Sequence, residues 1–142
     1  MTSTLTGHDL ANRDDVYELL SRFYGRALVD DLLAAPFEEV RAQGLETHLP
    51  VMCDFWETVL FRAGLYQGSA LQVHRGVHQR HQLSHRHFVR WLTLWCDTVD
   101  AMYRGPVAER AKIQAARIAR AMHRRLPGRD APELEVFLTL RP

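Results

Sequence analysis

The segment on which the interpretation of this chain turns is Gly68-Ser69-Ala70-Leu71-Gln72-Val73-His74-Arg75. Its apolar residues lead directly to His74. The segment lies between two longer stretches whose apolar residues are spaced as on one face of a helix. Imidazole is the commonest metal ligand among side chains. The segment therefore predicts a helical protein in which His74 faces a pocket between helices.

Helical spacing extends over most of the chain. Apolar residues recur at intervals of three and four, and neither sustained period-two alternation nor an Asn-Gly or Asp-Gly hairpin signal is found. We expect longer helices at about 14–29, 45–62, 85–104 and 107–126, and a short apolar piece at 69–75. The sequence thus predicts an all-α protein with bundle or globin-like packing.

Length and composition predict a single domain. With 142 residues the chain can bury about two-thirds of the surface that its unfolded form exposes. We expect one domain over 1–142, with a core over about 14–126 and a C-terminal tail over 127–142. No apolar run reaches the ~18 residues needed to cross a bilayer, and the N-terminus has no signal-peptide pattern. Free thiols at Cys53 and Cys96 then suit a cytoplasmic protein.

Charge is unevenly distributed although the net charge is only +1. Residues 1–60 carry eleven acids and four bases, whereas residues 71–129 carry twelve bases and three acids. The last long helix has a basic face, formed by Arg110, Lys112, Arg117, Arg120 and Arg124. One interpretation is therefore a helical interaction module whose basic C-terminal helix binds an acidic partner.

The histidine-rich region allows a second interpretation. The sequence has no Gly-rich phosphate loop, His-Glu-x-x-His, Cys-x-x-Cys or Gly-x-Ser-x-Gly motif, so several enzyme classes lose support. The spacings among His74, His78, His81, His85 and His87 would suit pairs of zinc ligands. However, no acid or cysteine lies between 74 and 87, and nearby arginines repel a dication. We therefore expect His78, His81 and His85 to be solvated in a polar loop.

A third interpretation is a haem pocket. One nitrogen of an imidazole binds the iron while the other donates to a backbone carbonyl, and the opposite side offers hydrogen-bond donors to a bound gas. His48, Met52, Phe55 and Val59 form a row on one helical face that begins polar and continues apolar. Tyr24 and Trp91 add donors on apolar rings from two further helices.

A family resemblance favours this third interpretation. Its motifs are Arg22-Phe23-Tyr24, Ala35-Pro36-Phe37, His48-x-x-x-Met52-x-Asp54-Phe55-Trp56, His74-Arg75 and His87-Phe88-x-Arg90-Trp91-Leu92. In this order they resemble the group III truncated haemoglobins of bacteria. The resemblance runs from about residue 15 to 125, and its specific parts are Asp54-Phe55-Trp56 and Phe88-x-x-Trp91-Leu92.

The resemblance implies a two-over-two helical sandwich that binds haem b. His74 corresponds to the proximal iron ligand, and His78, one turn later, remains a rival. The distal residues implied are Tyr24, His48 and Trp91. Phe37, Met52 and Phe55 would line the haem. Arg75 could pair with a haem propionate, but so could other arginines, and the sequence does not choose among them.

The function implied is reversible binding of O2, with NO and CO as further ligands. Oxygen storage or scavenging is one role that this implies. Detoxification of NO or peroxide would need a partner reductase, since nothing in the chain resembles a flavin or NAD site. We expect neither nucleic acid nor a membrane among the partners.

Overall fold

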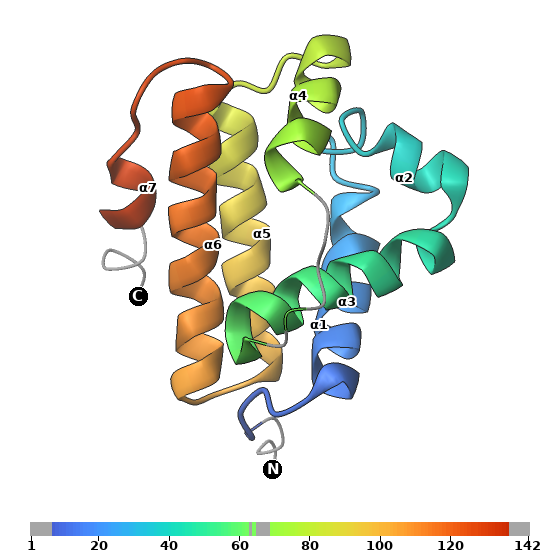
Figure 1. Ribbon diagram of the computed structural model, residues 1–142, viewed down its shortest axis with the longest axis vertical. Coiled ribbons are helices and arrows are strands. Elements are labelled where there is room, and N and C mark those ends of the chain that lie inside the picture. The colour runs from blue at the N-terminus through green and yellow to red at the C-terminus, as the bar shows by residue number, and fades with distance from the viewer. Residues whose placement is uncertain (1–6, 63, 65–68, 137–142) are drawn as a thin grey trace.

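The computed structural model describes residues 7–62, 64 and 69–136, and this part of the chain is helical without strands. The helices are α1 (Arg13–Ala27), α2 (Glu38–Gln43), α3 (Leu45–Phe61), α4 (Ala70–Arg80), α5 (His85–Met102), α6 (Pro106–Arg125) and α7 (Glu133–Val136) (Figure 1). The predicted all-α class is confirmed.

Two pairs of helices form the frame. α1 packs against α3, and α5 runs beside α6, to which the short turn before Pro106 connects it (Figure 1). Contacts between α1 and α5 join the two pairs, and α3 also reaches α6. This is the two-over-two arrangement that the sequence predicted.

A ladder of aromatic rings fills the space between the pairs. The rings of Trp56 and Trp95 stack with centroids 4.5 Å apart, and Phe23 meets Trp95 edge-on at 5.2 Å. The buried indole N–H of Trp95 donates to the carbonyl of Ala111 at 3.1 Å, which ties the ladder to α6. Such pairs are worth about 0.5–1.5 kcal/mol each beyond the area they bury, so the ladder fixes how α1, α3 and α5 meet.

The structure differs from the expected helices in three places. α2 was not expected, and it has no buried residue and hence no apolar stripe to find. α4 continues through Arg80, where a polar loop was expected, and it too has no buried residue. In the tail, α7 packs on α6 and buries Leu134, which extends the core beyond the expected limit at 126.

The beginning of α6 is capped by a residue from the other end of the chain. The Asp9 carboxylate accepts from the backbone N–H of Val107 at 2.9 Å and of Ala108 at 2.8 Å. Gly105 lies at φ +139°, and a Cβ there would come within 2.5 Å of Asp9. Burial alone would raise the pKa of Asp9, but the backbone hydrogen bonds outweigh it, and the pKa is lowered.

Replacing Asp9 by alanine is expected to destabilise the protein at pH 7 by about 0.5–2 kcal/mol, as for other lost N-caps. A carboxyl whose pKa is lowered by folding stabilises the protein above its ordinary pKa, 3.8, and this contribution is lost as the pH falls below it. Urea unfolding at pH 7 and pH 3 should therefore show a difference that shrinks at the lower pH. Asp31→Asn, at an exposed carboxylate, is the control, and an equal loss at both pH values would contradict the assignment.

Candidate functional site

His74 lies on α4, a helix whose N-cap is Ser69. The Ser69 hydroxyl accepts from the backbone N–H of Gln72 at 3.3 Å, and the extended backbone of Ser69 starts the helix there. His74 is half-buried, and its Nδ1 is 2.7 Å from the carbonyl oxygen of Ala70. Because a carbonyl can only accept, Nδ1 carries the proton, which leaves the Nε2 lone pair of the neutral ring available to a metal.

His78 has the opposite tautomer. Its Nδ1 accepts from the backbone N–H of Leu83 at 2.9 Å, so in the neutral ring the proton is on Nε2. A ring in this state offers no free lone pair to a metal. The hydrogen bonds therefore favour His74 over His78 as the iron ligand.

Tyr24 and His48 form a hydrogen-bonded pair contributed by α1 and α3. The Tyr24 hydroxyl is 3.0 Å from Nε2 of His48, and the two rings are perpendicular. Tyr24 is 4% exposed, and its burial raises the pKa of the phenol, which therefore remains a neutral donor.

The surroundings of His48 lower the pKa of its imidazole. Burial is the larger cause and lowers the pKa of His48, and the electrostatic effect of His74 lowers this pKa further. Both causes favour the neutral imidazole.

Aromatic and apolar side chains surround the pair. Phe37 meets Tyr24 edge-on at 5.7 Å, and Phe23 contacts both Tyr24 and Trp91. Trp91 stacks on Trp95 at 6.1 Å, and its indole N–H has no hydrogen-bond partner within the described part of the chain. Among the ring contacts of the described residues, Phe23 is the one that joins Trp91 to Tyr24.

The remaining predicted residues lie on α3 and α4. Met52 and Phe55 are partly buried and follow His48 along α3 by one and two turns, and Phe55 packs on Trp56. Arg75 is exposed and forms no ion pair with the described residues, so its predicted role toward a propionate remains a prediction.

The histidine-rich stretch does not form a metal site. The rings have separate partners: Leu83 for His78, Glu38 for His81, His123 for His85 and Ser84 for His87. Among the residues that the structure describes, no three His, Cys, Asp or Glu side chains could hold a metal ion together. These contacts do not support the zinc hypothesis. The expected polar loop is wrong for His78, which lies on α4, while His78, His81 and His85 are all partly exposed.

The pairing of His85 with His123 was not visible in the sequence. His123, on α6, is 2% exposed, and its Nδ1 donates to the carbonyl of Arg129. In the neutral ring, Nε2 of His123 then accepts from Nδ1 of His85, 3.1 Å away. The two residues are 38 positions apart, and neither lies in a motif that would indicate the contact.

Much of the basic face of α6 is neutralised within the protein. Arg120 binds both Asp130 and Glu135, and Lys112 binds Asp100 and Glu109. These pairs remove part of the charge on which an acidic partner would depend, so the structure gives the interaction-module interpretation less support than the composition did.

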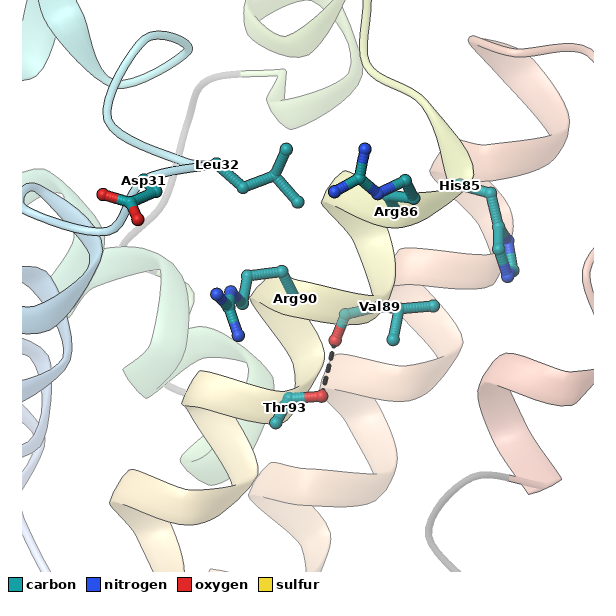
Figure 2. A pocket seen from close by; sticks show the side chains of 7 residues that line it. All are labelled: Asp31, Leu32, His85, Arg86, Val89, Arg90 and Thr93. Carbon is teal, nitrogen blue, oxygen red and sulfur yellow. Dashed lines mark hydrogen bonds between the residues drawn. The ribbon is translucent and has the colours of Figure 1, made fainter.

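A hollow of about 740 Å³ lies on another face of α5 (Figure 2). It is lined by Asp31, Leu32, His85, Arg86, Val89, Arg90 and Thr93, and in this view Leu32 points across it toward α5. Arg90 is held by Asp30 at 3.0 Å. None of the residues expected around the haem lines this hollow, although His85, a candidate in the zinc hypothesis, does.

Comparison with known structures identifies the architecture. The chain is similar to the crystal structure of a group III truncated hemoglobin from Campylobacter jejuni, with a TM-score of 0.76. The alignment covers 84% of this chain and 94% of that one. The fold is that of a group III truncated haemoglobin.

The truncated-haemoglobin fold agrees with the resemblance seen in the sequence motifs, while the identity over the aligned residues is only 20%. No protein-family model and no curated protein matches the sequence. In the described part of the chain, no helix is both long and apolar enough to cross a membrane.

Proposed function

We propose that the protein binds haem b through Nε2 of His74 and reversibly binds O2 on the opposite side, where NO and CO would compete. The observation that carries the proposal is the hydrogen bond from His74 Nδ1 to Ala70, because it orients the ring and leaves Nε2 free. The Tyr24–His48 pair, in which the hydroxyl of a buried tyrosine contacts an imidazole nitrogen at 3.0 Å, supports it.

The residues present suit this cofactor. Haem supplies an iron that binds diatomic gases. His74 provides a neutral nitrogen ligand, Phe37, Met52 and Phe55 provide apolar walls, and no strong competing metal site exists among the described residues.

Tyr24 is proposed to hold the gas. When His48 carries its proton on Nε2, it donates to the phenol oxygen of Tyr24, and the phenol hydrogen is then free to point at O2. A donor prepositioned in a buried site stabilises negative charge on the ligand at little reorganisation cost. Trp91 would be a second donor through its indole N–H.

The test is reconstitution with haemin. We expect a Soret band that saturates at one equivalent of haemin, and a shift of this band when the reduced protein is exposed to CO. A protein that gives no saturable band and unfolds at the same urea concentration with and without haemin would contradict the proposal. It would then favour the interaction-module interpretation.

A further inference from the structure

The helix that carries His74 is weakly held by apolar contacts. No residue of α4 is buried, and α4 has no extensive contact with any other helix. Val77 packs partly against the core, but the apolar stripe that anchors α1 or α5 is missing. The orientation of α4 must therefore depend largely on polar contacts.

The best placed of these contacts is made by His78. Its Nδ1 accepts the backbone N–H of Leu83 at 2.9 Å in a partly buried setting. The Leu83 side chain is 8% exposed and belongs to the hydrophobic core. The hydrogen bond thus connects the last turn of α4 to a residue that is fixed in the core.

Two other contacts at this end of α4 are weaker anchors. Arg80 pairs with Glu39 at 2.9 Å and His81 lies 3.7 Å from Glu38, but both carboxylates are more than half exposed. Exposed ion pairs contribute little and are screened by salt. The His78–Leu83 hydrogen bond is the shielded one.

We propose that His78 is a positioning residue for His74. The two histidines are four residues apart, so they lie on one face of α4, and fixing the ring of His78 fixes the height and rotation of the turn that carries His74. The proposal rests on haem ligation by His74. It gives His78 a role in that site without contact to the iron.

The test compares His78→Asn with His78→Leu. The Asn side-chain oxygen can take the place of Nδ1 and accept from Leu83, whereas Leu fills similar space without an acceptor. Neither side chain offers iron a nitrogen ligand of the imidazole type, so any difference between the variants reports the hydrogen bond alone.

The first measurement uses the protein without haem. Amide hydrogen exchange at Leu83 and along α4 is expected to be about three- to tenfold faster in His78→Leu than in the wild type, which corresponds to one hydrogen bond. His78→Asn should be close to the wild type. Equal exchange in all three proteins would overturn the contact, whether or not haem binds.

The second measurement uses the reconstituted protein. Transfer of haem to an excess of a scavenging apoglobin should be about three- to tenfold faster from His78→Leu, and the iron–histidine stretching band should broaden or shift in resonance Raman spectra. In His78→Asn, the transfer rate and the stretching band should both be close to those of the wild type. An unchanged band and transfer rate in His78→Leu would overturn the positioning role, while failure of the wild type to bind haem would instead refute the proposed function.

Discussion

Replacing His74 by glycine is expected to abolish specific haem binding. Loss of a group that merely orients a metal ligand costs about 10–100-fold in affinity, so loss of the ligand itself should exceed this range. The titration with haemin should then show no saturable Soret band. The protein should still fold, because His74 is only half-buried and α4 adds no buried residue to the core.

Free imidazole provides the decisive control for this variant. It can enter the space left by the missing ring and offer the same nitrogen, so we expect millimolar imidazole to restore the Soret band in His74→Gly. His78→Asn, which keeps the bond to Leu83, should bind haemin without imidazole. The opposite pattern, with binding lost in His78→Asn and kept in His74→Gly, would make His78 the ligand.

Replacing Tyr24 by phenylalanine is expected to accelerate O2 release about 10–100-fold. The estimate assumes a hydrogen bond to a partly charged acceptor, worth about 1.5–3 kcal/mol, at about 1.4 kcal/mol per factor of ten. Phenylalanine keeps the edge-on contacts with Phe23 at 5.2 Å and Phe37 at 5.7 Å, so only the hydroxyl is removed. Stopped-flow displacement of O2 by excess CO measures the rate.

Tyr103→Phe is a matched control for this prediction. Tyr103 is also buried, and its hydroxyl donates to the carbonyl of Asp15, which is a structural contact away from the proposed pocket. Its removal should leave the O2 dissociation rate unchanged even if the protein becomes less stable. An equal, small effect of both substitutions would mean that Tyr24 stabilises the fold and does not hold the gas.

The long helices were predictable because each buries an apolar stripe. Phe23, Trp56 and Trp95 each belong to the apolar stripe of a different helix, and each is buried as the spacing of that stripe predicts. α2 and the second half of α4 bury nothing, so their positions depend on contacts between distant residues such as Arg80 and Glu39. Periodicity cannot report contacts of this kind.

Parts of the candidate site followed from residue type, and parts did not. A family resemblance suggested that Tyr24 and His48 share a pocket, and the structure places them 3.0 Å apart. The sequence favoured His74 because it ends an apolar piece, but His78 remained a rival, because the choice depends on which ring nitrogen carries a proton. That proton follows from the partner of each Nδ1, a carbonyl for His74 and an N–H for His78, and neither partner is evident from composition or spacing.

The bond between Asp9 and the start of α6 has a consequence for the order of folding. Asp9 is separated from Val107 by 98 residues and from Ala108 by 99, so the loop that the contact closes contains α1 to α5. Closing so long a loop is entropically costly until other contacts have shortened it. During synthesis, the acceptor emerges long before its donors exist. The contact between Asp9 and α6 therefore forms last, after α6 has docked. Loss of this contact should mainly speed unfolding.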